Sequence, residues 1–174
     1  MAPGIDFTEL SPSQVLDLAV AVEEEARERY FELADQMAIH HTGEAAGFFR
    51  KMADLESHHA ERLRRRRAAL PETESAPADA VPEPVEVEAP EYFKVRAFMT
   101  VHDAVEAAVE AEKKAYRFYD DALGQVEDEE LRDLFGDLRA QEERHRELIE
   151  QFAATLPEED RSDPADYVDE PRAL

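Results

Sequence analysis

The sequence predicts an all-α protein, a four-helix bundle built from two duplicated helical hairpins with a long crossover linker between them. The chain of 174 residues contains only 5 glycines and is rich in Ala, Glu, Leu and Arg, a composition typical of helices. Apolar residues recur with the helical period in four long segments. The second half of the chain also repeats the first, which indicates a duplicated unit.

The first predicted helix covers about residues 12–39. Ser11 is a suitable N-cap, Pro12 fits the first helical position, and Gln14 completes a capping box with Ser11. The sequence HHTG at 40–43 is a short turn in which we expect the glycine to break the helix.

The second predicted helix runs from about Glu44 to Leu70, and Pro71 stops it. Residues 71–91, PETESAPADAVPEPVEVEAPE, hold five of the ten prolines, seven acidic residues and no basic residue, so we place an acidic, extended linker at 71–99. Its 21 proline-rich residues could span about 65 Å, whereas a helix of this size is about 40 Å long. The linker can therefore cross its own bundle or carry the second hairpin into a neighbour. We expect a homodimer, with a domain swap as one option.

The third predicted helix begins after Thr100, with Asp103 in the capping-box position, and Gly124 breaks it after about Leu123. The fourth covers about residues 128–156. We expect one domain and a tail, with these bounds: domain 1–156, hairpins 11–70 and 100–156, and an acidic C-terminal tail at 157–174.

The duplication becomes visible when the two halves are aligned. A shift of 89 residues aligns the first and third helices, matching Ser11 with Thr100, Glu23 with Glu112, Ala26 with Ala115 and Tyr30 with Tyr119. A shift of 86 residues aligns the second and fourth helices, matching Phe49 with Phe135, Glu56 with Glu142 and His59 with His145. The two shifts differ only by the length of the turn, so the repeated unit is a helical hairpin.

Each predicted helix carries one glutamate inside its apolar stripe, because side chains advance by about 100° per residue. These four residues are Glu23, Glu56, Glu112 and Glu142. The second and fourth helices add a histidine three residues later, about 60° around the same face. These are His59 and His145, whereas His58 lies roughly 160° from Glu56 on the solvent side.

Four carboxylates facing one another in a dry core cannot all stay ionised unless cations or water reach them. Two divalent ions would balance their charge, and two neutral imidazoles would complete the ligands. Oxygen ligands with one nitrogen per metal suit Fe, Mn or Zn, and the chain has no cysteine to compete. The sequence therefore predicts a di-metal carboxylate site. A plain bundle whose core polar groups are hydrogen-bonded is the alternative.

The repeated segments resemble the rubrerythrin branch of the ferritin-like superfamily. EEEARERY at 23–30 resembles the family's first-helix motif, ESHHA at 56–60 resembles its E-x-x-H-A motif, and EKKAYRFY at 112–119 and EERH at 142–145 repeat them. The match covers roughly 11–70 and 100–155. It implies a ferritin-like bundle that holds two Fe ions, for which Mn or Zn could substitute.

The resemblance also implies a role for each matching residue. Terminal ligands, each on one metal, would be Glu23 and Glu112. Ligands that bridge both metals would be Glu56 and Glu142. One histidine would complete the ligands of each metal, and these histidines are His59 and His145. Tyr30 and Tyr119 would donate hydrogen bonds that orient the ligand carboxylates, with simple core packing as the alternative.

Two departures from the family pattern affect the expected reaction. Rubrerythrins typically add a glutamate three residues after the third-helix ligand, and here that residue is Ala115. They also typically carry a cysteine-ligated rubredoxin domain, and this chain has no cysteine. The site is thus more symmetrical, closer to a bacterioferritin-type centre, and turnover would need an external electron donor.

The expected function is oxidation of Fe(II) with H2O2 or O2, serving peroxide detoxification or iron homeostasis. Iron storage, a catalytically silent metal-binding bundle and oxygenation of an organic substrate are the alternatives. The formal net charge of -23 argues against nucleic acid or an anionic membrane as partner. No apolar run approaches the roughly 20 residues of a membrane helix, and the N-terminus lacks signal-peptide features, so we expect a cytoplasmic protein.

Overall fold

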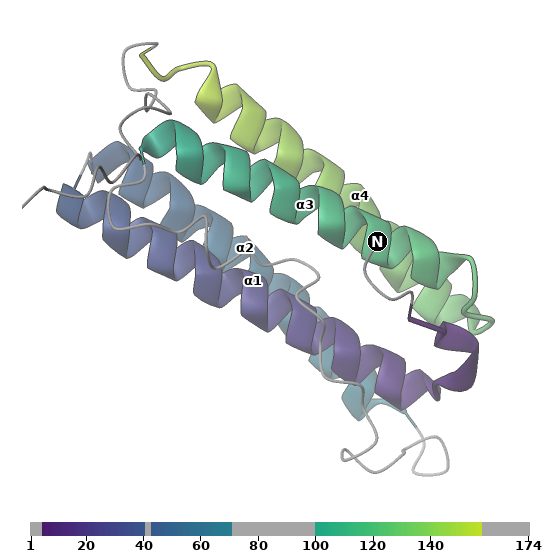
Figure 1. The fold of residues 1–174 in the computed structure, drawn as a ribbon. Helices are drawn as coiled ribbons and strands as arrows, with labels where there is room; N and C mark the ends of the chain where they lie inside the picture. The colour runs from purple at the N-terminus through teal and green to yellow at the C-terminus, as the bar shows by residue number, and fades with distance from the viewer. Residues whose placement is uncertain (1–4, 41–42, 71–99, 158–174) are drawn as a thin grey trace, which may run out of the picture.

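Four long helices lie side by side in the computed structural model, which describes residues 5–40, 43–70 and 100–157 (Figure 1). Their bounds, after a short 3-10 helix η1 (Phe7–Glu9), are α1 (Pro12–His40), α2 (Gly43–Ala68), α3 (Val101–Leu123) and α4 (Glu129–Ala153). The prediction of an all-α four-helix bundle is confirmed. The linker predicted at 71–99 and nearly all of the predicted tail lie outside the described residues.

The helices form two antiparallel hairpins, α1 with α2 and α3 with α4 (Figure 1). Helices α1 and α3 run in opposite directions, and α2 ends at the opposite end of the bundle from where α3 begins. Because the end of α2 and the start of α3 lie at opposite ends of the bundle, the connection between them must be a crossover.

The predicted helix starts are confirmed by their caps. The Ser11 N–H donates to Gln14 Oε1 at 2.9 Å, and the Gln14 N–H donates to Ser11 Oγ at 3.3 Å. Thr100 and Asp103 make the same reciprocal pair at 2.9 and 3.1 Å. Each box satisfies backbone donors that have no partner within the helix.

Several predicted boundaries differ from the observed ones by one to three residues. Gly43 is the first residue of α2 rather than part of the turn. Helix α2 ends before the predicted Leu70, and α4 ends before the predicted Leu156. In both, the last backbone bonds are of the tighter i to i+3 kind, such as Leu70 N–H to Arg67 O at 3.3 Å and Leu156 N–H to Ala153 O at 3.1 Å. These bonds turn the chain away from the helix axis.

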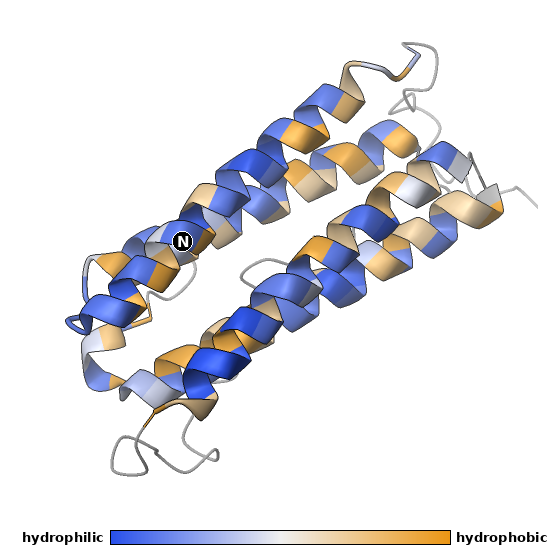
Figure 2. Cartoon of the chain, turned by 180° about the vertical axis from the view of Figure 1, so that it is seen from behind, coloured by the Kyte–Doolittle hydropathy of each residue, from blue (hydrophilic) through white to orange (hydrophobic). Residues whose placement is uncertain are grey.

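The core consists of two apolar clusters with a polar layer between them. One cluster lies toward the α1–α2 turn and includes Leu33, Met37, Phe49, Met52 and Ile149. The other lies toward the α3–α4 turn and includes Leu16, Leu63, Phe118, Leu131 and Phe135. Apolar and hydrophilic residues accordingly alternate along all four helices (Figure 2). On every helix the chain passes from one cluster to the other through the predicted inward glutamate.

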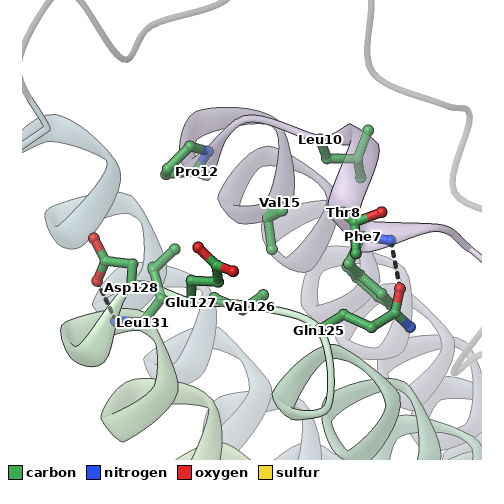
Figure 3. Close-up of a pocket in the computed structure, with 10 residues that line it drawn as sticks. All are labelled: Phe7, Thr8, Leu10, Pro12, Val15, Gln125, Val126, Glu127, Asp128 and Leu131. Carbon is green, nitrogen blue, oxygen red and sulfur yellow. Dashed lines mark hydrogen bonds between the residues drawn. The ribbon is translucent and has the colours of Figure 1, made fainter.

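The segment before α1 covers one end of the bundle, where we predicted no helix. Phe7 packs edge-on against Phe118 at 5.4 Å between ring centroids, and its backbone N–H donates to Gln125 Oε1 at 3.0 Å. A pocket of about 320 Å³ opens beside it, between η1 and the α3–α4 turn (Figure 3). None of the predicted metal ligands lines this pocket. In the described part of the chain, no helix combines the length and apolar character needed to span a membrane.

Candidate metal centre

The polar layer consists of the six side chains that the sequence predicts as metal ligands. All six are at most 4% exposed: Glu23, Glu56, His59, Glu112, Glu142 and His145. Among the described residues, the only other buried polar or charged side chain is Ser13. Helical periodicity places one glutamate of each helix in the core, and the bundle brings the four together. Such burial is costly for ionisable groups unless a partner compensates for the lost water.

The two histidine Nδ1 atoms lie among the carboxylates. His59 Nδ1 is 3.1 Å from Glu23, 3.0 Å from Glu56 and 3.3 Å from Glu142. His145 Nδ1 is 3.0 Å from Glu56, 3.4 Å from Glu112 and 3.7 Å from Glu142. Glu56 and Glu142 thus face both imidazoles, whereas each remaining glutamate faces one. This division agrees with the expected bridging and terminal roles, which stay predictions.

The two imidazole rings stack in parallel, with centroids 5.0 Å apart and an interplanar angle of 2°. One ligand atom from each of Glu56, His59, Glu142 and His145 lies within 4.8 Å of the others. Ligand atoms this close to one another can surround small cations. The neighbouring His58 is exposed, as predicted, and its ring contacts only the backbone oxygen of Asp54, at 2.6 Å.

Two tyrosines donate hydrogen bonds to Glu23 and Glu112 from the opposite hairpin. Tyr30 of α1 donates a hydrogen bond to Glu112 Oε1 of α3, and Tyr119 of α3 donates one to Glu23 Oε1 of α1. Tyr30 belongs to one apolar cluster and Tyr119 to the other, so they close the polar layer from its two sides. The tyrosines therefore do more than fill the core, because each orients a carboxylate.

Gln141 was not among the predicted site residues, and it contacts the outer side of the cluster. Its Oε1 lies 3.0 Å from His59 Nε2, the ring nitrogen that faces away from the carboxylates. The available signal was its position directly before Glu142, one turn before His145. That position places Gln141 at the edge of the apolar stripe, but periodicity alone does not show that it reaches a side chain of α2.

Burial shifts the pKa values of three of the glutamates upward. It raises the pKa of Glu23 to about 7, although His59 and Tyr119 act in the opposite direction. It also raises the pKa of Glu112, and the pKa of Glu142 rises well above 4.5 because the charge of Glu56 adds to burial. Glu56 differs. Burial would raise its pKa, but the contacts with His145 and His59 outweigh burial and lower the pKa to about 2.

The histidines respond to the same carboxylates. Burial would lower the pKa of His145, but its contacts with Glu112 and Glu56 raise the pKa to about 11. The pKa of His59 is also raised, since the charge of Glu23 and the contact with Glu142 outweigh burial. In the metal-free protein, bound protons therefore offset the negative charge of the carboxylates in this cluster. Divalent cations would displace those protons.

The carboxylate oxygens show how well the residues fit a pair of metal ions. In the described part of the chain, ten buried side-chain nitrogen and oxygen atoms make no hydrogen bond, and six of them belong to this cluster. They include both oxygens of Glu56 and both oxygens of Glu142. Buried polar atoms rarely remain without a partner, so their concentration at one place indicates a missing ligand. Oxygen donors with two imidazoles suit first-row divalent cations.

Comparison with known proteins places the chain in a family. The sequence model of the Rubrerythrin family matches residues 14–153. An uncharacterised conserved protein from Magnetospirillum magnetotacticum MS-1 has a similar structure, with a TM-score of 0.70 and 27% identity over 88% of this chain and 98% of that chain. A structure from Thermotoga maritima, described as a ferritin-like diiron-carboxylate protein, has a TM-score of 0.62 and 21% identity over 84% and 96%, a likeness of fold. No curated protein matches the sequence.

Proposed function

Because the chain belongs to the rubrerythrin family, we propose that it is a non-haem di-iron protein that oxidises Fe(II) with H2O2 or O2. Its physiological use would be peroxide detoxification or iron homeostasis. The observation that carries the proposal is the buried cluster of four glutamates and two histidines, in which one ligand atom from each of Glu56, His59, Glu142 and His145 lies within 4.8 Å of the others. Mn or Zn could occupy the same ligands.

In this proposal each ligand is assigned to one ion or to both according to the side chains beside it. Glu23 with His59 would hold one ion, Glu112 with His145 the other, and Glu56 and Glu142 would bridge them. Two Fe(II) ions held there would supply the two electrons that, with two protons from solvent, reduce one H2O2 to two waters or one O2 to H2O2.

The chain's own residues would prepare the site for this chemistry. Tyr30 and Tyr119 hold the terminal carboxylates through hydrogen bonds from their hydroxyl groups. The apolar clusters on either side keep bulk water from the polar layer. Nδ1 of each imidazole must lose its proton before it can bind a cation, so cation binding releases protons from the cluster.

Turnover would require an external electron donor, since the chain contains no cysteine for a rubredoxin-type centre. Ala115 stands where rubrerythrins typically place an additional glutamate, and it is fully buried. The resulting symmetry of the two halves favours plain Fe(II) oxidation, the ferroxidase reaction, over a self-sufficient peroxidase. Iron storage and a catalytically silent metal-binding bundle are the rival functions.

The test is anaerobic loading of the full chain with Fe(II), followed by stopped-flow mixing with H2O2 or with O2. Glu56→Ala and His59→Ala remove a bridging and a terminal ligand and should abolish the rapid oxidation. His58→Ala is the matched control, because it removes an adjacent but exposed imidazole. Size-exclusion chromatography of the loaded protein separates a homodimer from a storage shell.

A much faster reaction with H2O2 supports the peroxidase form of the proposal. An equal or faster reaction with O2 supports the ferroxidase form, and a large shell that retains iron supports storage. The proposal is wrong if the chain binds no stoichiometric iron, or if Glu56→Ala and His59→Ala behave like His58→Ala.

A further inference from the structure

The two halves of the cluster differ at one position outside the ligands. His59 Nε2 contacts Gln141 Oε1 at 3.0 Å, a side chain that α4 contributes. Among the described residues, no hydrogen bond reaches Nε2 of His145. The shift of 86 residues that aligns the hairpins places Leu55 at the position equivalent to Gln141. Leu55 has no polar side-chain atom, so it cannot give His145 the corresponding contact.

The orientation of the Gln141 amide is fixed by a second hydrogen bond. Its Nε2 donates to the backbone oxygen of Asp137 at 3.3 Å, one turn earlier on α4. The amide oxygen is therefore the atom that faces His59, and it can only accept. His59 Nε2 must donate, which leaves Nδ1, the atom among the carboxylates, free to bind a cation through its lone pair.

The other supports of the two halves match. Each terminal glutamate receives a hydrogen bond from a tyrosine of the opposite hairpin, Glu23 from Tyr119 and Glu112 from Tyr30. Each imidazole Nδ1 lies between 3.0 and 3.7 Å from both Glu56 and Glu142. Gln141 is thus the hydrogen-bonding partner that one half of the cluster has and the other lacks. Outer partners of this kind hold a ligand histidine in position and in the correct tautomer.

We propose that the two cation positions of the cluster are inequivalent and that the position beside His59 and Glu23 fills first, because Gln141 holds His59 ready for binding. Gln141 is then a positioning residue, and the ligands it favours are first-row divalent cations. This inference rests on the proposed function, since it assumes that the cluster binds two such ions.

The first test is an anaerobic titration of the metal-free full chain with Co(II), followed by visible absorption and by calorimetry. We expect two resolved steps whose affinities differ by about 10-fold to 100-fold, the usual effect of an outer partner on a ligand histidine. Gln141→Leu should weaken the first step by a similar factor, so that the two steps merge. Gln141→Glu keeps an acceptor oxygen at this position and should preserve both steps.

Leu55→Gln is the converse variant, because it offers an amide at the equivalent position beside His145. It should raise the affinity of the second step toward that of the first, so that the two affinities become similar. NMR of the Zn(II)-loaded protein with 15N-labelled histidine measures a property that a general change in stability would not alter. The Nε2–H of His59 should exchange slowly with water, and Gln141→Leu should make its exchange fast.

Three results would overturn the inference. If the wild-type chain binds two Co(II) ions with equal affinity, the positions are equivalent although the proposed function stands. If Gln141→Leu keeps both steps and the slow exchange, Gln141 does not position His59. If no Co(II) binds, the inference and the di-metal function fail together.

Discussion

Tyr119 on α3 donates a hydrogen bond to Glu23 on α1, which crosses from the second hairpin to the first. Tyr30 and Glu112 make the reciprocal contact in the other direction. Each hairpin therefore supplies the terminal glutamate of its own half of the cluster and the hydroxyl group that orients the glutamate of the other half. The candidate centre depends on both hairpins, and neither hairpin alone presents a supported set of ligands.

The first prediction concerns the variant Tyr119→Phe, which keeps the ring and removes the hydroxyl. A buried Glu23 that loses this donor should destabilise the metal-free protein by about 1–3 kcal/mol. Metal affinity should fall by about 10-fold to 100-fold, because the carboxylate is no longer held in place. Urea unfolding and Co(II) titration measure the two effects. Tyr116→Phe is the control, since Tyr116 is only partly buried and lies outside the cluster. Equal behaviour of the two variants would contradict the role of Tyr119.

The second prediction compares the two bridging glutamates in metal-free protein at pH 7. Glu56 is ionised between two protonated imidazoles, so Glu56→Gln leaves buried positive charge uncompensated and should cost about 3–5 kcal/mol. The raised pKa of Glu142 favours the protonated form of that carboxyl, which an amide resembles, so Glu142→Gln should change the free energy of unfolding by about 1 kcal/mol or less. Denaturant unfolding after chelator treatment measures both. Similar costs for the two variants would refute the assigned charges.

The third prediction is that metal-free protein becomes less stable as the pH rises above about 5. The pKa of Glu23 rises on folding from 4.5 to about 7, and that of His145 from 6.5 to about 11. Each group binds more protons when folded, so its stabilising contribution is complete below the unfolded pKa and is lost as the pH rises through the folded pKa. Glu56 acts in the other direction, because its pKa falls to about 2 and its contribution is lost below pH 4.5.

Urea unfolding of chelator-treated protein at pH 5, 7 and 9 measures this dependence. The unfolding midpoint should fall steadily across the series. Metal-loaded protein should show a smaller fall, since the cations replace the protons that the metal-free cluster needs. A midpoint that rises with pH in the metal-free protein would show that the cluster does not hold these protons.

The fourth prediction is that metal binding releases protons at pH 7. The pKa of each imidazole is raised, so both histidines carry a proton at Nδ1 that a cation must displace. Calorimetric titration with Co(II) in buffers of different ionisation enthalpy measures the number released. His58→Ala should release as many protons as the wild type, whereas His59→Ala should release fewer. A binding heat that is independent of the buffer would contradict the prediction.

The helical period was sufficient to predict which glutamates point inward. Rotation by about 100° per residue fixes the face of Glu23 and Glu56 without knowledge of their neighbours. The capping boxes at Ser11 and Thr100 were predictable for the same reason, since their hydrogen bonds are local. The duplication then paired these two residues with Glu112 and Glu142 in the second half of the chain.

Contacts between helices were harder to predict, because they depend on how each helix is rotated and displaced against its neighbours. The family resemblance implied that Tyr30 and Tyr119 support carboxylates, with core packing as the alternative, but not that each reaches the opposite hairpin. The contact of Gln141 with His59 joins α4 to α2 and leaves no periodic signal. The short helix at Phe7–Glu9 depends on packing against Phe118, so its own sequence does not specify it.

The most direct test of the central claim is a crystal structure of the full chain grown or soaked anaerobically with Fe(II), with anomalous data collected on both sides of the iron edge. The proposed centre requires two anomalous peaks in the polar layer, both in contact with Glu56 and Glu142, one beside His59 and the other beside His145. An empty polar layer, or iron bound only at the surface, would contradict the claim that these six residues hold a pair of metal ions.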